Sequence, residues 1–386
     1  MRGRLPTSTV LVLAGCTLVA LVVAAVGSER VAIQTPGAEP NHYQFPTNSP
    51  LDSTNSQLLT SANTVAHDLA CTGTTLAVAD IARGLSLYKW GSWRHPLNTV
   101  KPRGVLGYWR VVIQGHLAYA LTIRGFDIID ISQPTSASIV GSYLSGTENR
   151  SNPLGDKSTQ EDSDLLGGLH ERLDVRGAYA YLTDDLGNLQ IVDIHDPARP
   201  TRVGIVGFGG ASVGYRLTAV AAGPDSLVYV GVNGVLGHRG VEVVDVSSPM
   251  RPRQLSFIKL GSEPGLVLNR GMLFVVSRYI EPLRNTLTIF RAGPTLTKVS
   301  ELTLYKGSSR IVKICGSRAL IAFGQPPEGG FSTDRGYSGV ELIDIADPAR
   351  PRQIERFPTP GLAQAAIIRN GTILIAGGVA GLLVRN

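Results

Sequence analysis

One internal repeat constrains the fold of this chain more than any other feature of its sequence. Each complete copy has a Gly, Asn or similar start, alternating aliphatic residues and then an Asp. The complete copies occupy residues 125–131, 188–194, 240–246 and 339–345, and degenerate copies begin at Gly84, Thr286 and Gly381. Copies recur at intervals of about 40 to 63 residues, a spacing typical of solenoids and propellers. The sequence therefore predicts one repeat architecture.

Each copy belongs to a unit of four short strands. A second apolar run precedes every copy, and a third lies before that, separated by a tight turn that usually contains Gly. A fourth run follows the motif after a Pro-rich turn such as Asp196-Pro197-Ala198-Arg199-Pro200. Four short strands per unit, rich in β-branched residues, predict one propeller blade for each copy.

The two ends of the chain predict how the ring closes. The last copy, at residues 381–386, has no sequence after it to form a fourth strand. The run Ser56–Thr60 lies directly before the first blade and can supply that strand. We therefore expect an all-β, seven-bladed β-propeller over residues 55–386, closed by pairing N- and C-terminal strands. Rings of six or eight blades are the alternatives.

These motif copies resemble the LVIVD-repeat family of exported bacterial and archaeal propeller proteins, over roughly residues 56–386. The resemblance implies a surface or periplasmic location and a binding role, and it implies no catalytic residues. The copies at Gly84 and Thr286 depart from the pattern, because Lys89 and Arg291 stand near the place of the motif Asp.

The N-terminal segment predicts export. Arg2 and Arg4 precede an uncharged apolar run from Val10 to Val26. Residues 1–27 therefore read as a secretory signal peptide or a retained membrane anchor, followed by a linker over 28–54. The run Leu13–Cys16 also resembles a lipobox, in which Cys16 would carry a lipid. Each alternative places the body outside the cytoplasm, as a secreted, periplasmic or cell-surface protein.

Composition argues against several classes of partner. The formal net charge of +6 is spread along the chain without long basic runs, so we expect no nucleic-acid binding. The cysteines, at positions 16, 71 and 315, have no metal-ligand spacing. Cys71 and Cys315 are read either as a disulfide or, more simply, as buried free thiols.

Two carboxylate groups have simple structural explanations. Asp130, Asp193, Asp245 and Asp344 each precede a Pro-containing turn, where a carboxylate can accept turn N–H groups. The acidic loop 156–164 lacks the spacing of a calcium loop, and we interpret it as a solvated loop. No Ser-His-Asp set, zincin motif or phosphate loop is recognisable. We expect no metal and no cofactor.

Length variation marks one face of the predicted propeller as the binding face. The loops there, at about 144–168, 231–239, 278–285 and 325–338, vary in length, whereas the opposite turns stay short. Alignment on the turn glycines places one set of side chains where the inner strands begin: Arg110, Arg172, Arg216, Arg310, His67, Trp109, His170 and Glu263. Converging arginines predict an electropositive centre that attracts carboxylates or phosphates.

The sequence thus favours a non-catalytic binding module. Its expected ligand is an unidentified extracellular molecule or protein, held on the variable-loop face. The alternative is a propeller hydrolase or lactonase with a metal ion at the ring centre, which would need several Asp, Glu or Asn side chains there. We expect a monomer that meets a membrane only through its N-terminal segment.

Overall fold

The computed structural model describes residues 56–58, 64–146, 172–184, 186–208, 216–234, 237–280, 283–304, 309–323, 338–359, 363–378 and 380–385. All of them belong to one compact unit, which spans residues 51–326 and 336–386. The expected export segment 1–27, the linker 28–54 and the acidic loop 156–164 lie outside the described residues.

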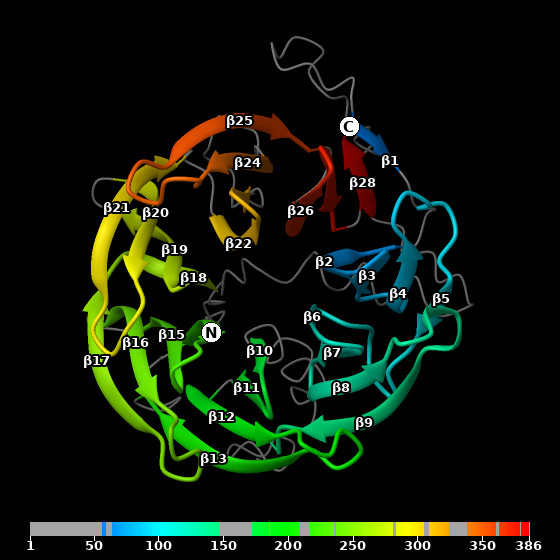
Figure 1. Cartoon of the computed structure of the whole chain (residues 1–386), viewed down its shortest axis with the longest axis horizontal. Helices are drawn as coiled ribbons and strands as arrows, with labels where there is room; N and C mark the ends of the chain where they lie inside the picture. Colours follow the sequence, from blue (N-terminus) through cyan, green and yellow to red (C-terminus); the bar gives the residue numbers. More distant parts are fainter. Residues whose placement is uncertain are drawn as a thin grey trace, which may run out of the picture. The chain divides into compact units, whose positions relative to one another are not determined.

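Seven antiparallel sheets of four strands each form the blades of a β-propeller (Figure 1). Blade 1 contains β2 (Ala66–Thr72), β3 (Thr75–Asp80), β4 (Gly84–Lys89) and β5 (Asn98–Val100). Blade 2 contains β6 (Arg110–Gln114), β7 (Leu117–Thr122), β8 (Gly125–Asp130) and β9 (Ser138–Leu144), with a 3-10 turn at Pro134–Ser136. Blade 3 contains β10 (Leu173–Arg176), β11 (Tyr179–Thr183), β12 (Asn188–Asp193) and β13 (Thr201–Gly207).

The remaining blades follow the same order from the centre outward. Blade 4 contains β14 (Arg216–Ala222), β15 (Leu227–Asn233), β16 (Arg239–Asp245) and β17 (Arg253–Lys259). Blade 5 contains β18 (Ser262–Asn269), β19 (Met272–Ile280), β20 (Leu283–Arg291) and β21 (Thr297–Leu304). Blade 6 contains β22 (Ser309–Cys315), β23 (Arg318–Phe323), β24 (Gly339–Asp344) and β25 (Arg352–Pro358). Blade 7 contains β26 (Ala365–Arg369), β27 (Thr372–Ala376), β28 (Leu382–Arg385) and β1 (Ser56–Leu58).

Blade 7 confirms the predicted closure of the ring. β1 pairs antiparallel with β28, and Ser56, Gln57 and Leu58 lie opposite Arg385, Val384 and Leu383. The blades at Gly84 and Thr286, which lack the motif Asp, are as complete as the others. Every repeat copy identified in the sequence therefore lies in the third strand of a blade.

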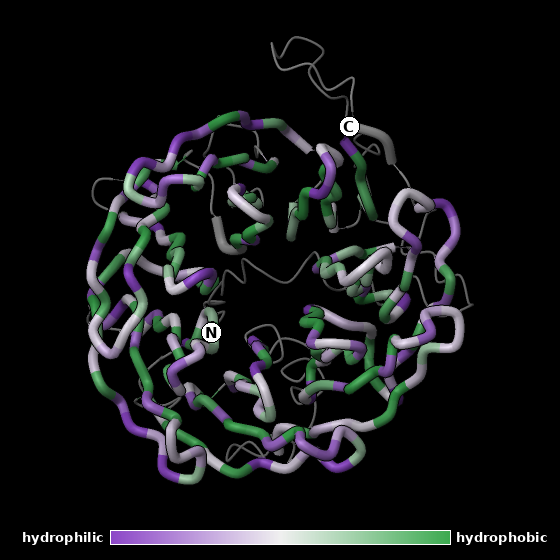
Figure 2. Tube along the Cα trace, in the orientation of Figure 1, coloured by the Kyte–Doolittle hydropathy of each residue, from purple (hydrophilic) through white to green (hydrophobic). Residues whose placement is uncertain are grey.

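The core lies between neighbouring blades. One buried cluster joins Leu85 and Leu87 of blade 1 to Val111 and Ile129 of blade 2, and similar clusters recur around the ring. Hydrophilic residues are frequent along the outermost strands and the turns (Figure 2). The middle strands are near-continuous apolar runs and are buried on both faces, because a blade packs against a neighbour on each side.

The Pro-rich turn of one blade contacts the outer strand of the blade before it. An alanine Cβ at Gly141 would lie 1.8 Å from the Pro197 carbonyl oxygen, and one at Gly204 would lie 1.8 Å from that of Pro249. In the next two blades a serine hydroxyl fills this place: Ser256 donates to the Pro294 oxygen and Ser300 to that of Pro348, each at 2.6 Å. The repeat's turn therefore joins neighbouring blades.

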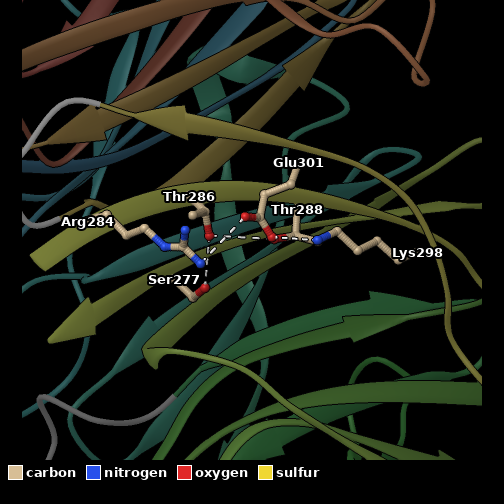
Figure 3. Close-up of polar contacts among 6 residues, drawn as sticks. All are labelled: Ser277, Arg284, Thr286, Thr288, Lys298 and Glu301. Carbon is tan, nitrogen blue, oxygen red and sulfur yellow. Dashed lines mark hydrogen bonds and ion pairs between the residues drawn. The ribbon is translucent and has the colours of Figure 1, made fainter. Parts of the chain in front are cut away.

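The third residue of the motif places a buried polar side chain in most blades. These residues are Ser86, Asp127, Gln190, Glu242, Thr288 and Glu341. In blade 5, Thr288 reaches Glu301, which also pairs with Lys298 at 2.8 Å (Figure 3). Buried polar groups are tolerated when they are hydrogen-bonded, so this position adds polar networks to the packed blades.

The structure corrects the prediction of a long loop at residues 278–285 and the prediction for Cys71. Residues 278–285 are no long loop, because β19 and β20 extend until Ile280 pairs with Leu283. Arg284 lies over the Tyr279 ring at 4.8 Å and stabilises this longer hairpin.

Cys71 and Cys315 are free thiols. Cys71 is exposed, so it is neither disulfide-bonded nor buried.

The predicted role of the motif aspartates is confirmed. Asp130 accepts a hydrogen bond from Ser132 N at 2.8 Å, and the corresponding bonds of Asp193, Asp245 and Asp344 span 2.9 to 3.0 Å. These bonds lower the pKa of each carboxyl; for Asp245, the Ser247 hydroxyl and Arg253 lower it to about 2. The carboxylates terminate strands and do not form a metal ring.

Candidate functional site

Irregular inner strands shape the centre of the ring on the face where those strands begin. The pairing register shifts between Ala66 and Asp68, between Leu217 and Ala219, between Ser262 and Gly265, and between Ser309 and Ile311. A bulge leaves one residue unpaired and re-aims its side chain, and bulges are frequent beside binding sites. The re-aimed positions are His67, Thr218 and Glu263 with Pro264, and the shift in β22 lies at Arg310.

The re-aimed His67 joins blade 1 to blade 2. Its Nδ1 lies 2.7 Å from the Trp109 carbonyl oxygen, and its ring meets the Trp109 indole edge-on at 5.2 Å. A carbonyl only accepts, so Nδ1 carries the proton and Nε2 is left as an acceptor. Burial first, then Arg172 and Arg110, lowers the pKa of His67 to about 4, despite opposing contributions from Asp68 and the Trp109 carbonyl. His67 is therefore neutral at pH 7.

Similar contacts join blades 3, 4 and 5. Arg172 Nε donates to the Thr218 carbonyl oxygen at 3.0 Å, and the Thr218 hydroxyl donates to the Pro264 oxygen at 2.7 Å. Arg216 lies 4.0 Å from Glu263, a partly exposed pair that contributes little to stability. Glu263 has φ of 51°, in the left-handed region. Such strain in a non-glycine residue is often associated with functional sites.

A chain of alternating charges lies deeper in the ring. Lys313 of blade 6 reaches across blade 7 to Asp68 of blade 1, with Nζ 2.9 Å from Oδ1. Arg110 of blade 2 interacts with both Asp68 and Asp174 of blade 3. Asp68 and Asp174 also accept backbone N–H bonds from the next blade, from Val111 at 3.2 Å and Ala222 at 2.8 Å. The charged side chains therefore hold non-adjacent blades together.

The pKa values of Asp68 and Asp174 shift in opposite directions in this environment. Burial opposes ionisation of Asp68, yet Lys313 and Arg110 outweigh it and hold the pKa of Asp68 below its usual value. Burial raises the pKa of Asp174, and the Ala222 N–H and Arg110 offset this only in part. Lys313 and Arg110 thus offset the charge of the two buried carboxyls at the ring centre.

Two neighbouring donors at this entrance lack acceptors. Trp109 Nε1 and Arg110 Nε are both buried and have no hydrogen-bond partner among the described residues. A buried donor without an acceptor costs about 1–3 kcal/mol. A ligand oxygen beside either nitrogen would satisfy it. The N-terminal end of β6 is therefore a part of the ring centre that is suited to hold an acceptor.

The structure brings part of the predicted residue set together. His67 interacts with Trp109, Arg110 and Arg172, and the pair Arg216 and Glu263 lies in blades 4 and 5. Arg310 lies at the bulge of β22, and His170 lies outside the described residues. Sequence reasoning missed Asp68, Asp174 and Lys313. Charged residues inside otherwise apolar inner strands were the available signal.

Within the ranges that the structure describes, no group of three or more His, Cys, Asp or Glu side chains is arranged to hold a metal ion. The same part of the chain contains no helix with the length and apolarity needed to cross a bilayer.

Seven four-stranded sheets in a ring define the fold as a seven-bladed β-propeller. The LVIVD repeat family model matches residues 108–145 and 167–207, which contain the strands of blades 2 and 3. The resemblance inferred from the motif copies is thereby confirmed. No curated protein matches the chain.

Solved structures show the same fold. The computationally designed Ika8 protein is similar over 85% of this chain and 99% of its own, with a TM-score of 0.54 and 9% identity. A putative 6-phosphogluconolactonase from Bacteroides fragilis NCTC 9343 is similar over 76% of this chain and 84% of its own, with a TM-score of 0.51 and 15% identity. At such identities these likenesses show the fold alone.

Proposed function

We propose that this chain is an extracytoplasmic, non-catalytic binding module that takes an anionic group at the ring centre, on the face where the inner strands begin. The observation that carries the proposal is the pair of unsatisfied donors, Trp109 Nε1 and Arg110 Nε. Arg172 adds a second guanidinium beside the neutral His67. A carboxylate or phosphate would accept charge-assisted hydrogen bonds from these groups.

The carboxylates nearby are already engaged by the protein. Asp68 pairs with Lys313, and Asp174 accepts two backbone N–H groups, from Val175 and Ala222. Their engagement supports anion binding over the alternative of a metal-dependent hydrolase, whose cation would need free carboxylates. The named lactonase activity of the Bacteroides fragilis protein gives the competing reaction for a test.

The test uses Trp109 as its own reporter. With Trp90→Phe and Trp93→Phe, Trp109 is the sole tryptophan of the chain. Acetate, glucuronate and methyl phosphate are titrated against its fluorescence, with acetamide as the uncharged control. We expect a saturable change for the anions only. Arg110→Gln should weaken binding about 10- to 100-fold, the range for a lost charge-assisted hydrogen bond.

Arg199→Gln provides the matched control, because Arg199 is exposed in a Pro-rich turn on the opposite face. It should leave the affinity unchanged. An anion response that survives Arg110→Gln would show that the site lies elsewhere, and no response to any anion would reject the proposal. Hydrolysis of 6-phosphogluconolactone with a stoichiometric bound metal would favour the hydrolase instead.

A further inference from the structure

We propose that the short-turn side of blades 7 and 1 is a docking surface for anionic lipid, which turns the ring-centre site away from the membrane. The surface consists of Lys89, Trp90, Trp93, Arg94 and Arg369. This inference is independent of the proposed ligand site. It departs from the expectation that the chain meets a membrane only through its N-terminal segment.

The surface arises where blade 1 departs from the repeat. Blades 2, 3, 4 and 6 follow their third strand with an Asp that binds the turn backbone. Blade 1 instead has Lys89-Trp90-Gly91-Ser92-Trp93-Arg94-His95, with Gly91 at φ of 89°. Two of the three tryptophans of the chain are in this turn. The turn therefore has a composition that the repeat itself does not require.

The tryptophans form a supported but accessible cluster. Trp90 and Trp93 meet edge-on with ring centroids 5.1 Å apart, and both are partly buried against the core between blades 7 and 1. The Arg369 guanidinium of blade 7 lies 5.3 Å from the Trp90 ring and donates to the Gly73 oxygen. Tryptophan beside Lys and Arg is typical of the membrane–water interface.

Charge on this surface has one sign. Lys89, Arg94 and His95 are exposed, and the described turns 72–75, 89–97 and 369–372 contain no Asp or Glu. The Pro-rich turns of blades 3 and 6 each contain two carboxylates, at Asp193, Asp196, Asp344 and Asp347. An anionic leaflet attracts each nearby Lys or Arg by about 1 kcal/mol, so charge favours this sector of the face.

The N-terminal strand begins on the same side. β28 and β4 are the third strands of adjacent blades, so both end on the short-turn face, at Arg385 and Lys89. Ser56 lies opposite Arg385, so the 55 residues before it, including the apolar run 10–26, join the propeller at this face. A chain that enters a bilayer through that run would therefore be joined to the propeller at this face.

The experiment compares tryptophans on the two faces. The full chain is mixed with vesicles of brominated phosphatidylcholine with phosphatidylglycerol, or of brominated phosphatidylcholine alone. Bromine quenches tryptophan fluorescence on contact. We expect strong quenching in the anionic vesicles for Trp109→Phe, which keeps Trp90 and Trp93. The double variant Trp90→Phe/Trp93→Phe, which keeps Trp109, should show little.

Charge variants keep both tryptophans and alter only exposed residues. Lys89→Gln/Arg94→Gln, in the Trp109→Phe chain, should weaken contact of the surface with anionic lipid about 30-fold, as expected for two cations. Arg199→Gln/Arg251→Gln removes two exposed cations from the same face in blades 3 and 4 and should change nothing.

Three results would overturn the inference. They are equal quenching of the two tryptophan sets, quenching that Lys89→Gln/Arg94→Gln leaves intact, and no quenching in anionic vesicles. A response of Trp90 and Trp93 to soluble heparin without any response to vesicles would assign the surface to an acidic glycan. None of these results depends on Arg110, so the ring-centre proposal can fail or succeed separately.

Discussion

At the scale of single residues, the ring centre depends on buried charges whose environment sets their ionisation. Asp68 stays ionised because Lys313 and Arg110 surround it, although it is only 2% exposed. Removing one member of a buried pair leaves the other charge uncompensated, which is more costly than losing the pair's attraction. These residues therefore couple the integrity of the ring to the charge at its centre.

His67 gives a pH dependence with a defined sign. Its pKa is about 4 in the folded chain against 6.5 for the free side chain. Between these pH values the unfolded state binds the proton and the folded state does not, so stability falls as pH falls from 6.5 to 4. The full shift corresponds to about 3 kcal/mol. Urea unfolding at several pH values measures it.

His67→Gln should flatten that dependence, because glutamine does not titrate and can still donate to the Trp109 carbonyl. Loss of stability below pH 4 should remain, because the lowered pKa of Asp68 places its protonation there. An identical profile for the variant between pH 6.5 and 4 would show that His67 does not cause the effect.

At the scale of strands and turns, the repeat encodes contacts between blades as well as strands within them. A register shift occurs in the third-to-fourth strand pairing of blades 2 to 6, for example between Ile128 and Ile129. In blades 2 to 5 the small residue of the fourth strand then contacts the Pro carbonyl of the next blade. In blades 3, 4 and 6 the Asp and Pro of the motif fix the turn that supplies this carbonyl, whereas blade 5 supplies it from Pro294 without the Asp.

Gly141→Ala tests the contact between turn and strand. Its Cβ would lie 1.8 Å from the Pro197 oxygen, so blades 2 and 3 must separate. We expect a loss of about 1–3 kcal/mol, the usual cost of overpacking, measured by urea unfolding. Gly293→Ala is the control, because its Cβ would lie 3.5 Å from the nearest atom. Equal stability of the two variants would contradict this account of the motif.

At the scale of the whole molecule, one three-residue strand closes the ring. β1 covers the edge of β28, and without it the last blade has an exposed edge. Deleting residues 1–60 should lower stability by about 2–3 kcal/mol, or roughly 4–8 °C in Tm, since the β1 pairing is lost. Calorimetry measures the shift.

Deleting residues 1–54 is the matched control, since it removes the N-terminal segment and keeps β1. It should melt like the intact propeller. If both truncated chains melt at the same temperature, strand β1 does not stabilise the ring.

The sequence alone predicted seven blades, with six and eight as the alternatives, and it predicted the strand order and the closure. Each depends on local patterns, namely apolar alternation, turn glycines and the Asp-x-Pro signal, which act within a few residues. It also placed Arg110 and Arg172 at the entrances of inner strands, because those strands are equivalent in every repeat.

Only the tertiary structure decided which residues Arg110, Arg172 and their neighbours contact. The bulges that re-aim His67, Thr218 and Glu263 break the period-two pattern and have no sequence signal of their own. Lys313 and Asp68 are 245 residues apart in the chain and become partners only when the ring closes. Contacts between blades depend on the packing of whole sheets, so a pattern read within one repeat cannot contain them.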